Sequence, residues 1–248
     1  MHPPGPAFTM AAPLPMKVSI YGPTGIALGK HNVKDSRLDQ ADKLVEAKKK
    51  VYAQVDVVGA EEALKADAIV TSAESRLELV LQDLEFVETR LAHNPPAAEA
   101  AVLAKMKTAL EAERFISCAG ITPEEWQTTE AHAFLTAKPV VVGTAEELGQ
   151  FDEFLPKVLS ESGVICFLTV GGIENRAWPI KKGITAPEAA ATIHTDLLKS
   201  FIRAEVIGWA DFVAAGGEKQ AKHAGKLRLE PRTYVVQDYD IVNFRVNK

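Results

Sequence analysis

The chain has 248 residues, of which 47% are apolar and 25% are charged, and its formal net charge is −5. This size and composition are typical of a globular protein with one large domain or two smaller ones. Because no run of about eighteen apolar residues occurs, we expect no membrane-spanning helix. The two cysteines, Cys118 and Cys166, lie far apart in the sequence and predict buried, reduced thiols in a cytoplasmic protein.

The N-terminal region begins with a proline-rich stretch, residues 1–15, that has neither a basic start nor an apolar segment. We predict a disordered extension here rather than a signal peptide, with the folded part beginning at Met16. Residues 17–21 then predict a short buried strand, and residues 22–25 (Gly-Pro-Thr-Gly) predict the turn that follows it.

The next segment predicts a helix followed by two strands. The helix opens at residues 35–38 and closes near a run of three lysines at 48–50. Residues 51–58 are rich in valine with a period of two, and residues 66–71 form a second apolar run, so both predict strands.

The clearest helical pattern is a heptad repeat in which apolar residues recur at alternating spacings of three and four, at Leu77, Val80, Leu84, Val87 and Leu91. Two prolines, Pro95 and Pro96, end it, and a second amphipathic run follows. The pattern predicts an antiparallel helical hairpin over residues 74–116. We expect one apolar stripe to be enough for the pair to bury itself, so that the hairpin projects from the body.

A helix start at residues 122–125, a strand at 139–142, a helix at 146–159 and a strand at 164–170 complete this part of the chain. Alternating strands and helices favour an α/β fold with a mostly parallel sheet.

After residue 175 the pattern changes to short strands with few helices. We expect strands at 177–180, 201–207, 234–236 and 241–246 and helices at 186–194 and 211–224. The sequence therefore predicts a small α+β module at the C-terminal end.

Charge is distributed unevenly between these parts. Residues 176–248 carry 12 Lys and Arg against 8 Asp and Glu, a net charge of +4, whereas residues 1–175 carry 16 against 25, a net charge of −9. A basic module on an acidic body favours docking on a phosphate-rich surface. The alternative is a chance imbalance on solvated faces.

Several separated motifs in the C-terminal module resemble one known domain. They are Arg176-Ala177-Trp178, residues 182–187 (Lys-Gly-Ile-Thr-Ala-Pro), residues 193–196 (Ile-His-Thr-Asp), residues 201–206 (Phe-Ile-Arg-Ala-Glu-Val) and residues 234–238 (Tyr-Val-Val-Gln-Asp). Together they resemble the TGS domain of YchF-type Obg-like P-loop NTPases, which implies a ubiquitin-like β-grasp fold. One departure is Tyr239, which stands where the family has glycine in an Asp-Gly-Asp turn. A turn that needs a positive φ would be strained by tyrosine.

The resemblance extends upstream through residues 35–39, 53–55, 67–70 and 135–140 and through the helical hairpin. It implies a G-like α/β domain with an inserted coiled coil. We therefore expect three parts: the extension 1–15, a degenerate G-like domain over residues 16–175 and a TGS domain over residues 176–248.

The nucleotide-binding motifs of that family match poorly. A Walker A loop needs four residues between its glycines, followed by Lys and a hydroxyl that holds Mg²⁺. Here only three residues separate Gly25 from Gly29, and Lys30 is followed by His31, a poor Mg²⁺ ligand. The chain also leaves no room for the helix whose N-terminus binds phosphate. Residual nucleotide binding would use the remaining loop residues, Gly22, Gly25, Gly29 and Lys30.

Two other signatures of the family are weak or missing. An Asp-Xaa-Xaa-Gly pattern occurs at residues 56–59, but it has only two fixed positions. The base-reading asparagine expected after Lys138-Pro139 is absent, and the six histidines show no metal-ligand spacing. A nucleophile–base pair of Cys118 and His132 has no support in the sequence.

The functional prediction is a non-catalytic interaction protein without a cofactor, located in the cytoplasm. Its C-terminal module would bind the ribosome, structured RNA or a translation-associated protein, using phosphate contacts that do not read bases. The residues expected at this interface are Arg176, Lys181, Lys182, His194, Lys199, Arg203, Lys226 and Arg228.

Two alternatives remain open. The first is a residual GTP- or ATP-binding protein that uses Mg²⁺ and hydrolyses little or nothing, because positioning and metal supply nearly all phosphoryl-transfer catalysis. The second is a sensor for an unrelated small ligand.

Overall fold

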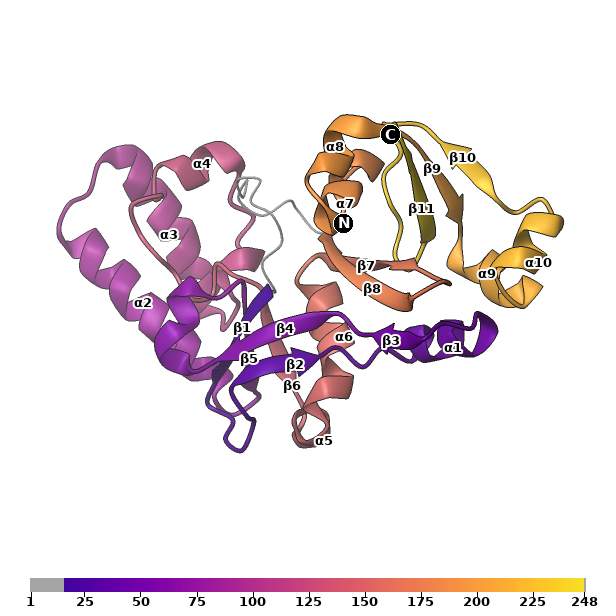
Figure 1. Ribbon diagram of the computed structural model, residues 1–248. Helices are drawn as coiled ribbons and strands as arrows, with labels where there is room; N and C mark the ends of the chain where they lie inside the picture. Colours follow the sequence, from indigo (N-terminus) through magenta and orange to yellow (C-terminus); the bar gives the residue numbers. More distant parts are fainter. Residues whose placement is uncertain (1–15, 248) are drawn as a thin grey trace. The chain divides into compact units, whose positions relative to one another are not determined.

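The computed structural model describes residues 16–247, so the predicted N-terminal extension lies outside the described residues (Figure 1). The described residues divide into two compact units. The N-terminal unit contains residues 16–30 and 56–151, and the C-terminal unit contains residues 31–55 and 152–247. No helix in the described part of the chain is long and apolar enough to cross a membrane.

The first sheet has five strands in the order β2-β4-β1-β5-β6. Their bounds are β1 (Met16–Tyr21), β2 (Gly29–Asn32), β4 (Gln54–Val58), β5 (Ala68–Ser72) and β6 (Val140–Gly143). Strands β1, β5 and β6 run parallel, as the sequence predicts, with Val18 opposite Ala68 and Ile69 opposite Val140. Parallel central strands are buried on both faces, and accordingly Val18, Ile69 and Val70 have no solvent exposure.

Helices and short turns of the N-terminal unit follow these strands. They are η1 (Ala60–Lys65), α2 (Arg76–Ala92), α3 (Ala97–Glu111), η2 (Ile116–Cys118), α4 (Pro123–Gln127) and α5 (Ala145–Gly149). Capping boxes at Thr122 and Thr144 start α4 and α5, because each threonine and a glutamate three residues later satisfy each other's backbone amides.

The helical hairpin of α2 and α3 forms as the sequence predicts, but it packs on its own unit more than the heptad pattern implies. Val80 and Val87 are buried in a cluster that also includes Ile116 and Phe134 from the segment after the hairpin. The heptad residue Leu77 is 40% exposed. Helix α2 therefore packs against the segment after the hairpin as well as against α3, and not through a single apolar stripe as we expected.

A buried carboxylate fixes the hairpin to this following segment. Asp83 of α2 accepts hydrogen bonds from the Leu135 and Thr136 amides at 3.0 and 2.7 Å and from the Thr136 hydroxyl at 2.6 Å. Burial raises the pKa of Asp83 above its ordinary value, although the three donors oppose this shift.

The second sheet has six strands in the order β10-β9-β11-β7-β8-β3. Their bounds are β3 (Lys49–Val51), β7 (Val164–Thr169), β8 (Glu174–Lys181), β9 (Phe201–Ile207), β10 (Arg228–Glu230) and β11 (Ile241–Val246). It is a mixed sheet: β3–β8 and β7–β11 are parallel pairs, and the other neighbours are antiparallel. The helices of this unit are α1 (Ser36–Leu44), α6 (Phe151–Glu161), α7 (Ala186–Ile193), α8 (Asp196–Ser200), α9 (Trp209–Ala215) and α10 (Glu218–His223).

One face of this sheet packs against α7. The core consists of three alanines of the helix, Ala186, Ala189 and Ala190, and of apolar residues on the strands and in the segment before β11, namely Phe167, Ile180, Phe201, Ala204, Val206, Val236 and Val242. Small helix residues let α7 lie close to the strands.

The structure divides the chain differently from the expected boundary at residue 175, which falls inside β8. Strand β7 pairs with β8 as an antiparallel hairpin, with Phe167 opposite Trp178, and so belongs to the C-terminal sheet. The predicted strand 51–58 is divided between the two sheets as β3 and β4. A period-two pattern shows that a segment is a strand but does not show which strand it pairs with.

Two smaller differences concern the C-terminal module. The helix expected at 211–224 is broken into α9 and α10 by Gly216 and Gly217, whose φ values are +85° and +126°. The strand expected at 234–236 makes only one bridge, from Val235 to Thr185.

Candidate functional site

The loop predicted to hold residual nucleotide connects β1 to β2. Its glycines Gly22, Gly25 and Gly29 all have positive φ values, of +95°, +86° and +108°. Gly22 is also closely packed, since a β-carbon placed there would lie 2.0 Å from the Ser75 hydroxyl oxygen. Ser75, the residue before α2, therefore lies directly against Gly22 at the end of β1.

This loop lacks the geometry that binds the phosphates of a nucleoside triphosphate. Phosphate loops lead into a helix whose free N–H groups face the phosphates, whereas here Gly29 and Lys30 begin strand β2. Lys30 is exposed on that strand, and the next helix starts only at Ser36. Because strand β2, and not a helix, follows the loop directly, we derive no hydrolytic step from it.

Cys118 and His132, whose pairing has no support in the sequence, have different partners in the structure. His132 makes a 2.9 Å contact with the Glu99 carboxylate, which also accepts two hydrogen bonds from Arg90. Arg90 and then His132 lower the pKa of Glu99 to about 2. The cluster joins α2, α3 and the segment before Phe134 and is a structural contact of the hairpin.

Five of the eight residues predicted to bind RNA or a partner already have partners in the C-terminal unit. Arg176 lies 3.3 Å from Glu174 and stacks over the Trp178 ring, 4.0 Å from its centroid. The other ion pairs are Lys226–Asp211 at 3.0 Å, Arg228–Glu230 at 2.9 Å and His194–Asp196 at 3.4 Å. Lys181 is exposed and also makes an interaction.

The remaining three, Lys182, Lys199 and Arg203, are exposed. None of them forms an ion pair with any residue that the structure describes. They come from three elements: the turn after β8, the end of α8 and the middle of β9. Cations that no carboxylate neutralises remain available to an anionic partner.

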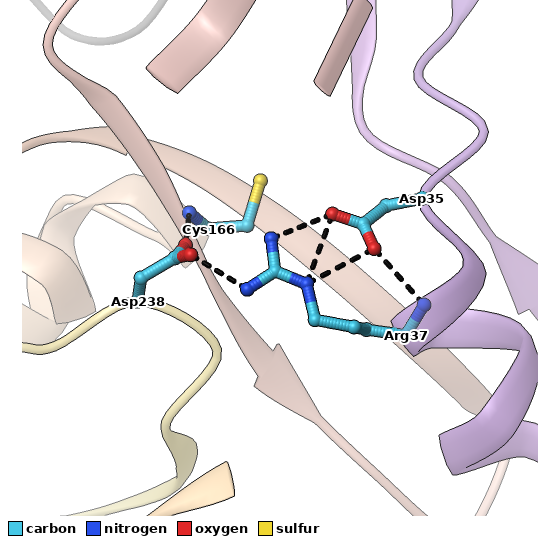
Figure 2. A network of polar contacts seen from close by, with 4 residues as sticks. All are labelled: Asp35, Arg37, Cys166 and Asp238. Atoms are coloured by element: carbon cyan, nitrogen blue, oxygen red, sulfur yellow. Dashed lines mark hydrogen bonds and ion pairs between the residues drawn. The ribbon is translucent and has the colours of Figure 1, made fainter. Parts of the chain in front are cut away.

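A polar network in the C-terminal unit surrounds the guanidinium of Arg37 (Figure 2). The Asp35 carboxylate caps α1 by accepting from the Arg37 amide at 2.9 Å, and it also accepts from the guanidinium at 2.7 Å. Asp238 accepts from the other side of the guanidinium at 2.6 Å and from the Cys166 amide at 3.1 Å. The network thus ties α1 to β7 and to the turn before β11.

Tyr239 completes this network. Its ring lies 3.6 Å from the Arg37 guanidinium and packs edge-on against Trp209, with 5.6 Å between the ring centroids. Its φ is +60°, so the tyrosine adopts the left-handed conformation that the resemblance led us to expect of a glycine. Burial raises the pKa of the Tyr239 hydroxyl and of the Cys166 thiol, so neither group is a ready nucleophile. The polar groups of this network bond to one another, so we interpret the network as a structural contact that holds α1, β7 and the turn before β11 together.

The same unit contains a cavity of about 450 Å³ beside β11. Strand β11 pairs with β7 only at Ile241, opposite Leu168, and the cavity lies next to residues 241–244. The lining of the cavity includes the polar residues Glu205, Glu218 and Asn243. The other lining residues are the end of β7 with the turn that follows it and several apolar side chains: Thr169, Val170, Gly171, Gly172, Ile193, Leu197, Ile207, Leu227, Ile241, Val242 and Phe244.

Comparison with known proteins identifies the relatives of the chain. The YchF-GTPase_C family, described as a protein of unknown function (DUF933), matches residues 164–247. The "Ribosome-binding ATPase YchF" of Bacillus subtilis is 32% identical over an alignment of 248 positions, which covers 74% of this chain and 68% of that protein. The chain belongs to the YchF family of Obg-like ATPases.

Two further comparisons concern a shorter stretch of sequence and the fold. The "Ribosome-binding ATPase YchF" of Haemophilus ducreyi is 56% identical over 81 residues, which are 33% of this chain and 22% of that protein. The solved structure of the Schizosaccharomyces pombe YchF GTPase has a similar fold, with a TM-score of 0.69, 19% identity and coverage of 93% of this chain and 97% of the other. The mixed α/β fold is therefore that of YchF.

Two expectations from the sequence are corrected by these findings. We expected a protein that is not an enzyme and that uses no cofactor, on the basis of the altered Walker A loop. The relatives are named ATPases, and the matched solved structure is named a GTPase, so these proteins hydrolyse nucleoside triphosphates and both expectations conflict with the family. The altered Walker A loop alone therefore did not justify the prediction of a protein without enzymatic activity or the prediction of a protein without a cofactor.

The structure also reveals residues that the sequence analysis missed. Arg245 lies directly opposite Arg203 in the pairing of β11 with β9. The alternation in residues 241–246 places Asn243 and Arg245 on one face of the strand and could have indicated an exposed basic position. The contact between Arg37 and Tyr239 joins residues about two hundred positions apart, and no local pattern in the sequence points to it.

Proposed function

We propose that this protein is a ribosome-associated member of the YchF family and that its C-terminal unit supplies the contacting surface. The observation that carries the proposal is that Lys182, Lys199 and Arg203 are exposed and form no ion pair with a described residue, and that all three lie within the stretch matched by the YchF C-terminal family. The names of the relatives, which describe ribosome-binding proteins, support the same partner. A ribosome-associated protein would act in the cytoplasm.

We further infer that residues 164–247 form a β-grasp domain of the TGS type. Strands β7, β8, β9 and β11 with α7 packed across one face support this assignment. Phosphate contacts by Lys and Arg would then supply most of the affinity, so binding should weaken steeply as the salt concentration rises.

Co-sedimentation with purified ribosomes tests this proposal. We expect the protein to pellet with ribosomes at low salt and to be lost from the pellet when Lys182, Lys199 and Arg203 are all changed to glutamate. A control with Lys65→Glu changes an exposed lysine of the N-terminal unit and should still pellet. If the unmodified protein stays in the supernatant at low salt, the proposal is wrong.

The second candidate function is binding of ATP or GTP with Mg²⁺, which the names of the relatives favour. Titration calorimetry with ATP, GTP and GDP in the presence of Mg²⁺ tests it. Micromolar binding would support this function, and a Lys30→Ala variant would then show whether the β1–β2 loop takes part. Absence of heat at about millimolar nucleotide, an affinity no better than about −4 kcal/mol, would contradict it.

A further inference from the structure

The outer face of the β9–β11 ladder carries two arginines side by side. These strands are adjacent and antiparallel (Figure 1), and Arg203 and Arg245 are direct partners in their register. The residues that alternate with them, Ala204 and Val206, have no exposure and face the core under α7. Arg203 is exposed, and the side chain of Arg245 is 59% exposed, so both guanidinium groups are open to solvent.

The carboxylate that contacts this pair of arginines in the described part of the chain is Glu205. Glu205 accepts from Arg245 at 2.7 Å and from Asn243 at 3.0 Å, and the bond from Arg245 is the main reason why the pKa of Glu205 is lowered. Arg203 has no ion-pair partner among the residues that the structure describes. Like charges directly opposite each other destabilise a strand pair. A bound anion would offset the repulsion between the two guanidinium groups.

Further cations belong to the same corner of the fold. The Asn247 amide donates to the Ser200 carbonyl at 2.9 Å, which brings the end of β11 to the residue after Lys199. Arg232 donates to the Phe201 carbonyl at 2.7 Å and therefore lies at the start of β9. Acidic residues near this corner are Asp196 on α8, which is exposed and contacts His194, and Glu230 on β10, which pairs with Arg228.

We propose that Arg203 and Arg245 bind the phosphodiester backbone of ribosomal RNA, an assignment that rests on the ribosome association proposed above. Directly opposite residues on paired strands have β-carbons about 5 Å apart, close enough for both guanidinium groups to reach one phosphate. The planar fork of arginine matches two phosphate oxygens. Leu229, opposite Glu205 on β10, is 58% exposed, and this one apolar side chain does not make the apolar centre that a protein partner would need.

The test measures the affinity for intact ribosomes and for deproteinised ribosomal RNA by filter binding over a series of salt concentrations. For the variant with Arg203→Gln and Arg245→Gln, we expect affinity to fall about tenfold to a hundredfold. The slope of log affinity against log salt should become shallower by about 2, one unit for each lost phosphate contact.

Controls separate this effect from a loss of folding. Replacing Arg245 leaves Glu205 without its ion pair, so the variants are compared by circular dichroism and thermal unfolding. Arg203→Gln alone breaks no ion pair in the described structure and should still reduce the slope by about 1. Lys219→Gln removes an exposed, unpaired cation on α10 of the same unit and should leave the slope unchanged.

The outcomes distinguish two failures. If the unmodified protein does not bind ribosomes, the proposed function itself is wrong. If it binds ribosomes and the folded double variant binds with the same affinity and salt slope, the contact lies elsewhere and this inference is overturned. Binding to ribosomes but not to deproteinised RNA would mean that the face recognises a ribosomal protein, which also overturns the phosphate assignment.

Discussion

At the scale of single residues, Tyr239 shows how a strained backbone conformation is compensated by packing. A φ of +60° costs a non-glycine residue on the order of 1 kcal/mol. The tyrosine ring is 2% exposed and lies between Arg37 and Trp209. Burial of an aromatic side chain and its contact with a cation stabilise the fold by more than this cost.

We therefore predict that Tyr239→Gly destabilises the protein although it removes the backbone strain. The free energy of unfolding, measured with urea, should fall by about 2–3 kcal/mol, which is the usual loss for a large buried side chain less the strain relieved. Tyr239→Phe keeps the ring and should lose less. A glycine variant more stable than the parent would show that strain outweighs packing here.

A second residue-scale prediction uses two adjacent glycines between α9 and α10. Both have positive φ values, but a β-carbon on Gly216 would meet nothing within 4 Å, whereas one on Gly217 would lie 3.0 Å from the Leu44 carbonyl oxygen. Both alanine variants should lose about 1 kcal/mol from backbone strain, and Gly217→Ala should lose more because α1 must shift. Equal losses in urea unfolding would contradict this close approach.

At the scale of elements, the helical hairpin is held by an ionic cluster in addition to its apolar core. Arg90 on α2 and His132 both contact Glu99 on α3, and this carboxylate is almost fully buried. The heptad pattern predicted that two helices pair, but it gave no indication of this contact, since its members do not follow the apolar repeat.

This cluster predicts a pH dependence. The pKa of Glu99 is lowered from an ordinary value of 4.5 to about 2, so the folded state favours the charged form. The stabilisation is complete above the unfolded pKa of 4.5 and is lost as the pH falls from there toward 2. The difference in unfolding free energy between the parent and Glu99→Gln should therefore shrink over this interval. A constant difference from pH 6 to about 2 would show that the ion pairs do not act this way.

At the scale of the whole molecule, the C-terminal unit is assembled from two separate stretches of chain. Strand β3 pairs with β8, and the Arg37 network joins α1 to the turn before β11. The buried Asn175 side chain donates to the Asp42 carboxylate at 2.8 Å and to the Val45 carbonyl at 2.7 Å. Residues 31–55 thus supply an edge strand, a covering helix and polar partners.

We predict that a fragment of residues 152–248 alone does not reach the stability of this unit. The fragment would expose the surface that α1 covers and would leave the buried side-chain amide of Asn175 without its hydrogen-bond acceptors. Both changes lower the free energy of unfolding. Urea unfolding followed by circular dichroism should show a lower midpoint, and a peptide of residues 31–55 added in trans should raise it. A fragment as stable as the unit in the intact protein would contradict the assembly described above.

Sequence alone determined the local features of this protein. Apolar periodicity and proline positions gave the parallel strands β1 and β5 and the hairpin of α2 and α3, because these patterns reflect burial of one face or stripe. The motifs from Arg176 to Asp238 indicated the YchF family, which the comparisons show.

Tertiary structure alone decided which segments belong together. The assignment of β7 and residues 31–55 to the C-terminal unit depends on strand pairing, and the positions of Arg37 under Tyr239 and of Arg203 opposite Arg245 depend on register. Contacts between distant residues follow from the global packing, which no local window of sequence contains.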